Sequence, residues 1–77
     1  GILMESYSTQ PVEQLYTGNW MTCNFVGKNG KRYPARAALC LETQHYPDSP
    51  NKPEYPSTVL RPGETFQSKT IYKFSVE

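Results

Sequence analysis

The sequence predicts an all-β fold of antiparallel strands, and three observations support this class. Residues 66–76 alternate with the period of two that is typical of a strand, so that Phe66, Tyr72 and Phe74 point to one face. Asn29-Gly30 stands between two strand-like runs, which is the strongest short signal for a hairpin turn. Seven Pro, five Gly and six Tyr in 77 residues favour strands and turns over helices. We expect about five or six strands.

The amino-terminal half contains short extended runs separated by turn residues. We expect strands over residues 2–8, 15–17 and 20–26, with breaks at 9–11 and 18–19. The first and last strands of the chain look long, and no helical pattern is available to cover them. Exposed strand edges favour pairing with another polypeptide.

The Asn29-Gly30 turn also predicts a register. If these two residues form the whole loop, Lys28 faces Lys31, and a return strand runs from Lys31 towards Thr43. Pro34 within that return strand indicates a sheet edge or a bulge, because proline has no backbone N–H to donate.

Two cysteines are too few for a disulfide framework, and their spacing matches no metal motif. In the register set by the turn, Cys23 faces Arg36 and Cys40 faces Asn19. The two thiols are then too far apart for a disulfide. We therefore expect structural or free thiols and no metal site.

The second half opens with a loop and closes with the last strand. Residues 44–56 contain four prolines, which exclude them from a sheet interior. A short strand is expected over 58–60 and a type II turn over 61–64, where Pro62 is second and Gly63 third. The last strand is expected over 64–76.

Glu42 is the main candidate for chemistry. On the return strand, Cys40 and Glu42 point to one face and Leu41 to the other. Small side chains at Ala38 and Cys40 leave room above that face, so the carboxylate can meet a bound polar molecule. The alternative is that Glu42 simply reaches solvent at a strand end, as charged residues generally do.

The remaining polar and aromatic candidates are weaker. His45, the only histidine, falls on the opposite face from Glu42 in a continuous strand, so a solvated or loop-packing histidine is favoured over an acid–base pair. Lys28, Lys31 and Arg32 form a solvated turn, and with a net charge of +1 the chain offers no field for nucleic acid or a membrane surface. Three aromatic residues can either stack on a sugar or pack in the fold: Trp20, Tyr46 and Tyr55.

Several segments carry a family resemblance in the same order and spacing. They are ME at 4–5, QLYTGN at 14–19, CLETQHYPDSPN at 40–51, YPS at 55–57, LRPGE at 60–64 and TIYKF at 70–74. With these segments the chain closely resembles the C-terminal end of the aldose 1-epimerases, over nearly its whole length from about Met4.

The resemblance implies a fold, an activity and two site residues. These enzymes interconvert the α and β anomers of hexoses such as galactose and glucose without a metal or organic cofactor. Their fold is a large, galactose mutarotase-like β-sandwich. The motif L-E-T-Q maps the general base onto Glu42, and the glutamine before the Y-T-G-N segment maps sugar-hydroxyl binding onto Gln14. His45 matches no catalytic position of the family. Val12 stands where the family usually has glycine, so the turn before Gln14 is expected to differ.

These observations lead to one expectation with two alternatives. We expect residues 1–77 to be the C-terminal fragment of an aldose 1-epimerase domain, without a second domain and inactive alone, because the general acid lies elsewhere. Its partners are then a hexose and the missing N-terminal portion or a second copy, and a cytoplasmic location is favoured. The alternatives are a non-catalytic carbohydrate-binding β-module and a self-associating structural fragment.

Overall fold

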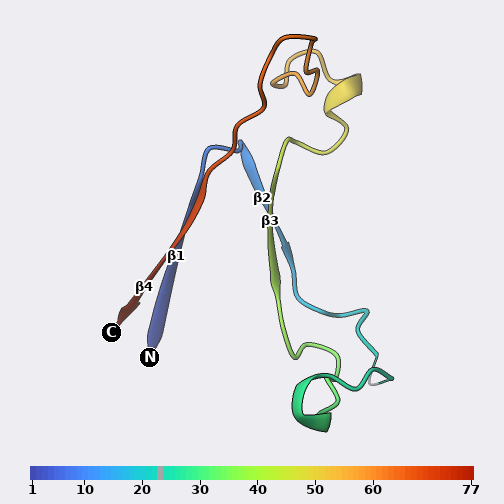
Figure 1. The fold of residues 1–77 in the computed structure, drawn as a ribbon, viewed down its shortest axis with the longest axis vertical. Helices are drawn as coiled ribbons and strands as arrows, with labels where there is room; N and C mark the ends of the chain where they lie inside the picture. Colours follow the sequence, from blue (N-terminus) through green and yellow to red (C-terminus); the bar gives the residue numbers. More distant parts are fainter. Residues whose placement is uncertain (23) are drawn as a thin grey trace. The chain divides into compact units, whose positions relative to one another are not determined.

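The computed structural model describes residues 1–22 and 24–77 (Figure 1). In these residues the elements are β1 (Ile2–Ser8), β2 (Val12–Tyr16), the 3₁₀ helix η1 (Lys28–Gly30), β3 (Cys40–Gln44), the 3₁₀ helix η2 (Ser49–Asn51) and β4 (Thr70–Val76). The strands form two antiparallel pairs, β1 with β4 and β2 with β3, which confirms the all-β class. The chain divides into two units, one of Gly1–Val12 with Thr43–Glu77 and one of Glu13–Glu42.

The first and last strands of the chain pair with each other. The antiparallel register runs from Ile2 opposite Val76 to Ser8 opposite Thr70. Beyond β1 the pairing continues for one step, because the backbone N–H of Thr9 donates to the carbonyl of Lys69 at 3.0 Å. The predicted strand 2–8 is therefore confirmed. The predicted strand 64–76 begins only at residue 70, since β1 offers no partner residue for the segment before it.

The two faces of the β1–β4 pair both carry exposed apolar side chains, but charged side chains lie on only one of them. One face carries exposed apolar side chains from both strands: Ile2, Met4, Tyr72, Phe74 and Val76. The other face carries an ion pair between Glu5 and Lys73, with the charged atoms 3.2 Å apart. This alternation is the one expected for strands whose neighbouring side chains point to opposite faces.

The predicted turn at Gly18 follows β2. Gly18 is buried at φ +70°, and its carbonyl accepts hydrogen bonds from the backbone N–H groups of Met21 at 3.2 Å and Arg36 at 3.0 Å. A Cβ at this position would lie 2.8 Å from the carbonyl oxygen of Ala38, which no real Cβ tolerates. Only glycine therefore fits this turn.

The long hairpin expected around Asn29-Gly30 is only partly present. The turn itself is confirmed, because the Lys31 N–H donates to the Lys28 carbonyl at 3.2 Å, and Asn29 and Gly30 have φ values of +57° and +69°. Next to it, however, Val26 pairs with Arg32 in an isolated bridge, one residue away from the predicted register. A bulge accounts for the shift, since the Gly27 N–H bonds the Lys31 carbonyl at 2.7 Å and leaves the next residue unpaired in the ladder.

The strands expected over 20–26 and 31–43 are therefore wrong in most of their length. On the return side the strand is limited to Cys40–Gln44. Before it, the Ala37 N–H donates to the Pro34 carbonyl at 3.1 Å, and Arg36 has a left-handed φ of +67°, so a turn replaces the extended backbone. Cys40 is a free, exposed thiol, whereas Cys23 lies outside the described residues, so the expected separation of the thiols stays a prediction.

The proline-rich segment after β3 is a loop, as predicted, with the short helix η2 inside it. The strand expected over 58–60 is wrong, because the Val59 N–H bonds the side chain of Ser57 at 3.1 Å instead of a neighbouring strand. The type II turn is confirmed, since the Glu64 N–H donates to the Arg61 carbonyl at 3.1 Å and Gly63 has φ +86°.

Among the described residues, no apolar side chain is buried. Trp20, for example, is 83% exposed and Phe74 63%. Burial of apolar surface is the dominant favourable term in folding, at roughly 25 cal/mol per Å². The described residues therefore lack the hydrophobic core that would hold such a sheet together, and their apolar side chains are available to other surfaces.

Candidate functional site

Glu42 is the central residue of β3, and its side chain is exposed. Its neighbours Leu41 and Thr43 are half-buried, as expected for the opposite face of the strand. Among the described residues, none donates a hydrogen bond to the Glu42 carboxylate, and none forms an ion pair with it. An ionised carboxylate is an acceptor only, so this group is free to take a proton from a hydroxyl group that reaches it.

Gln14 is the central residue of β2 and is also exposed. Its side-chain amide nitrogen donates to the carbonyl of Leu15 at 3.4 Å, which is a long and weak bond. The structure brings Gln14 and Glu42 onto neighbouring strands of one two-stranded sheet (Figure 1). Val12 begins β2 and is not among the residues with positive φ, so the extended backbone there accommodates its side chain.

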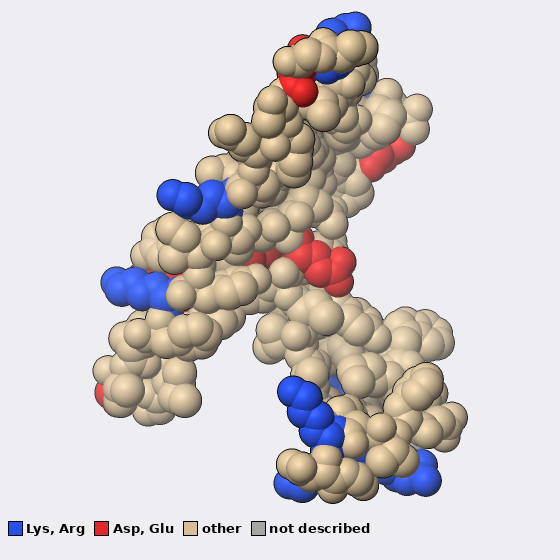
Figure 2. Space-filling model, in the orientation of Figure 1, with Lys and Arg blue, Asp and Glu red and all other residues tan. Residues whose placement is uncertain are grey.

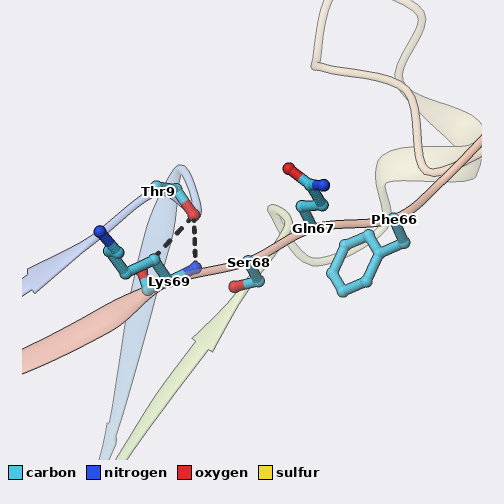
Figure 3. Close-up of a pocket in the computed structure, with 5 residues that line it drawn as sticks. All are labelled: Thr9, Phe66, Gln67, Ser68 and Lys69. Atoms are coloured by element: carbon cyan, nitrogen blue, oxygen red, sulfur yellow. Dashed lines mark hydrogen bonds between the residues drawn. The ribbon is translucent and has the colours of Figure 1, made fainter.

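Three hollows in the described residues can be compared with the positions of these two side chains. The one with the largest volume of the three, about 650 Å³, is open (Figure 3). It is lined by the residue that follows β1 and by the four residues that precede β4: Thr9, Phe66, Gln67, Ser68 and Lys69. The Thr9 hydroxyl accepts a hydrogen bond from the Lys69 N–H at 3.0 Å. None of these three hollows is lined by Glu42 or Gln14.

His45 follows the last residue of β3 and is half-buried, in agreement with the predicted loop histidine. The next aromatic residue, Tyr46, packs against Tyr55 with ring centroids 4.8 Å apart. This contact favours the packing interpretation for both tyrosines, while Trp20 remains open to solvent.

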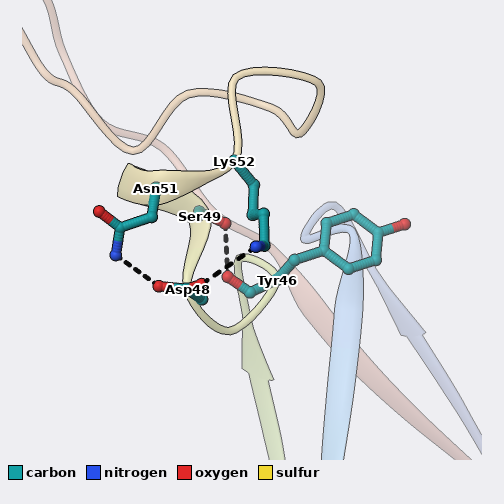
Figure 4. A network of polar contacts seen from close by, with 5 residues as sticks. All are labelled: Tyr46, Asp48, Ser49, Asn51 and Lys52. Atoms are coloured by element: carbon teal, nitrogen blue, oxygen red, sulfur yellow. Dashed lines mark hydrogen bonds and ion pairs between the residues drawn. The ribbon is translucent and has the colours of Figure 1, made fainter.

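A local polar network that we did not predict surrounds η2 (Figure 4). Asp48, at φ +64°, accepts a hydrogen bond from the side chain of Asn51 at 2.5 Å and forms an ion pair with Lys52 at 3.6 Å. The Ser49 hydroxyl donates to the carbonyl of Tyr46, and Ser49 is buried. The only sequence signal is the order Asp-Ser-Pro-Asn, whose short polar side chains bond nearby backbone. These contacts fix the loop that follows Glu42.

In the part of the chain that is described, neither the charged side chains nor the potential metal ligands form a second candidate site. On the face shown in Figure 2, several basic side chains and no acidic ones are visible at the lower right, whereas both kinds occur over the upper part. The net charge is only +1. Within the described residues, no three His, Cys, Asp or Glu side chains converge on a possible metal position. The same residues contain no helix with the length and hydropathy that a membrane crossing requires.

Comparison with known proteins gives a consistent result. The family model described as aldose 1-epimerase matches residues 1–73. The chain is 51% identical to the galactose mutarotase of Mus musculus and 49% identical to that of Homo sapiens, in each case over 76 residues, 99% of this chain and 22% of the relative. It is 38% identical to the aldose 1-epimerase of Escherichia coli (strain K12), over 96% of this chain and 22% of that protein.

The chain thus spans about a fifth of the length of the curated relatives that it matches. Within that span the match is almost continuous, and it includes the strand that carries Glu42 and the strand that carries Gln14. The chain belongs to the aldose 1-epimerase family.

Proposed function

We propose that residues 1–77 act as the C-terminal part of an aldose 1-epimerase that interconverts the α and β anomers of a hexose. In this proposal Glu42 is the general base, and Gln14 binds sugar hydroxyl groups. The observation that carries it is the position of Glu42: an exposed carboxylate without a partner among the described residues, on a strand next to the one that carries Gln14. The names of the relatives, aldose 1-epimerase and galactose mutarotase, support the reaction class.

The reaction needs a base and an acid together. The Glu42 carboxylate takes the proton from the C1 hydroxyl of the sugar, and the oxygen electron pair forms the C1 carbonyl. The bond between C1 and the ring oxygen breaks, and the ring oxygen takes a proton from the acid. Rotation about the C1–C2 bond then presents the other carbonyl face, and the reverse steps close the ring as the other anomer. Assistance of this kind contributes about 10²–10⁴-fold for each group.

The acid is expected from the rest of the enzyme. His45 is the only histidine of the chain, and it lies in the loop after β3 instead of on the strand face with Glu42. A carboxylate that works as base cannot supply the second proton at the same time. The chain therefore contributes one half of the acid–base pair, and we expect the isolated 77 residues to be inactive.

A chimaera tests this proposal. The 76 matched residues replace the corresponding segment of the Mus musculus galactose mutarotase, and mutarotation of α-galactose is followed by polarimetry. We expect an active chimaera, an inactive isolated chain, and a kcat lowered by about 10²–10⁴-fold in Glu42→Gln with KM little changed. Glu54→Gln is the matched control, because Glu54 is an exposed loop carboxylate outside β3, and it should leave kcat unchanged.

Two outcomes would contradict the proposal. Wild-type turnover in Glu42→Gln would remove Glu42 from the mechanism. Binding of galactose by the isolated chain, measured by titration calorimetry, together with an inactive chimaera, would instead favour the non-catalytic carbohydrate-binding module.

A further inference from the structure

The tip of the partial hairpin carries a chemically unusual pair of residues. Asn29 and Gly30 both have left-handed φ values, and both residues are exposed to solvent. No hydrogen bond among the described residues engages the Asn29 side chain. Around Gly30 the space is open, since a Cβ built there would meet no atom within 4 Å. The side-chain amide of Asn29 and the backbone that follows it are therefore accessible to each other and to water.

The turn is held by exposed hydrogen bonds, and none of its residues is buried. The Lys31 N–H bonds the Lys28 carbonyl at 3.2 Å, the Gly27 N–H bonds the Lys31 carbonyl at 2.7 Å, and the Lys28 N–H bonds the Tyr33 hydroxyl at 3.0 Å. Segments with few buried contacts and solvent-exposed backbone hydrogen bonds open at low free-energy cost. A brief opening allows ψ of Asn29 to leave its value of 27° and brings the Gly30 nitrogen to the side-chain carbonyl carbon.

We propose that Asn29 is a site of spontaneous deamidation and backbone isomerisation. The Gly30 backbone nitrogen, after loss of its proton, attacks Cγ of Asn29. A new C–N bond forms, the Cγ–Nδ2 bond breaks, and ammonia leaves with a proton, which gives a five-membered succinimide. Water then adds to one of the two ring carbonyls and opens the ring. Attack at Cγ yields aspartate, and attack at the backbone carbonyl yields isoaspartate.

The surroundings of Asn29 favour this reaction over the same reaction at the other asparagines. Glycine has no side chain to block ring closure, whereas Asn19, Asn24 and Asn51 precede Trp20, Phe25 and Lys52. Asn51 is also held by its 2.5 Å hydrogen bond to Asp48. Lys28 and Lys31 flank Asn29, and nearby cations favour the anionic nitrogen and the carboxylate product.

The two products have different structural consequences. Aspartate tolerates the left-handed conformation and keeps the turn, but it lowers the formal net charge of the chain from +1 to zero. Isoaspartate carries the chain through its side-chain carbon, which adds an atom to the main chain. The Lys31 to Lys28 hydrogen bond that closes the two-residue turn is then lost.

Peptide mass spectrometry of the 77-residue chain tests the inference. The chain is incubated at body temperature and mildly alkaline pH, and digested samples are followed over time. We expect the peptide that contains Asn29 to gain about 1 Da per molecule and to split into aspartyl and isoaspartyl peaks. This gain should be at least several-fold faster than at the other three asparagines and should accelerate as the pH rises. The isoaspartyl peak should accept a methyl group from an L-isoaspartyl methyltransferase.

Two variants serve as controls. Gly30→Ala should slow the mass gain several-fold, because the added methyl group hinders attack by the backbone nitrogen. Asn29→Gln should nearly abolish it, because the longer side chain disfavours the five-membered ring. Equal rates at all four asparagines, an undiminished rate in Gly30→Ala, or no mass gain at Asn29 would each overturn the inference. None of these outcomes depends on epimerase activity.

Discussion

Glu5 and Lys73 face each other across β1 and β4, with Oε2 of Glu5 3.2 Å from Nζ of Lys73. The other carboxylate oxygen of Glu5 accepts a hydrogen bond from the Tyr7 hydroxyl at 2.8 Å. One carboxylate therefore joins a cation on the opposite strand and a phenol two residues along its own strand. A slip of β4 by one residue would move Lys73 to the other face and break this arrangement, so it favours the observed register.

Removal of this ion pair should have a small, measurable effect. We expect Lys73→Ala to lower the free energy of unfolding of the chimaera by about 0.2–1 kcal/mol, because both charged groups are partly exposed to solvent. The exchange Glu5→Lys with Lys73→Glu should restore most of that loss. Urea unfolding gives the values, with Lys69→Ala as control. A double-mutant cycle without coupling between residues 5 and 73 would contradict the assignment.

The Tyr7 hydroxyl should titrate above its ordinary range. The hydrogen bond to Glu5, with a smaller effect of desolvation, raises the pKa of Tyr7 from its usual 10.0. Because the protonated phenol is favoured in the folded state, its contribution to stability is present below about pH 10 and is lost as the pH rises through the raised pKa. NMR titration of labelled tyrosine measures this pKa, and Glu5→Gln should lower it. An equal Tyr7 pKa in the unmodified protein and in Glu5→Gln would show that the hydrogen bond to Glu5 does not raise it.

Local chemistry explains what the sequence could predict about the fold. The alternation of residues 2–8 and the Pro62-Gly63 pair each specify a structure within a few residues, and both were predicted correctly. Strand partners are not local, and no pattern indicated that the first strand would pair with the last. The error over 31–39 arose because a left-handed Arg36 interrupts a run with strand-like composition, and the bulge at Gly27 shifted the register of the hairpin by one residue.

For the candidate site, the sequence likewise predicted the local features and not the surroundings. The alternation around Leu41 and Glu42 predicted which side chain is exposed, and the motif identified the strand. The surface around these two side chains could not be predicted in the same way, because alternation along one strand does not indicate which side chains other segments place beside it. The roles of Glu42 and Gln14 therefore stay predictions that depend on kinetics.

Gly63 should be sensitive to substitution because of its backbone conformation alone. Its φ is +86°, but a Cβ built there meets no atom within 4 Å. We expect Gly63→Ala to destabilise the chimaera by about 1–2 kcal/mol, the usual cost of a left-handed conformation in a residue with a side chain. Urea unfolding measures the loss. Gly1→Ala, at a position without positive φ where a Cβ would meet no atom within 4 Å, should have no effect, and a loss as large as that of Gly63→Ala would point to another cause.

Gln14 should act on sugar binding more than on the chemical step. Its amide is exposed on β2 and holds only the long bond to the Leu15 carbonyl, so little free energy is lost when it turns to a sugar hydroxyl. A neutral hydrogen bond contributes about 0.5–1.5 kcal/mol, so we expect Gln14→Ala in the chimaera to lower kcat/KM by roughly two- to tenfold, mainly through a higher KM. The control Gln10→Ala, before β2, should leave both constants unchanged. A fall in kcat as large as that of Glu42→Gln would instead place Gln14 in the proton transfer, and unchanged constants would remove it from the site.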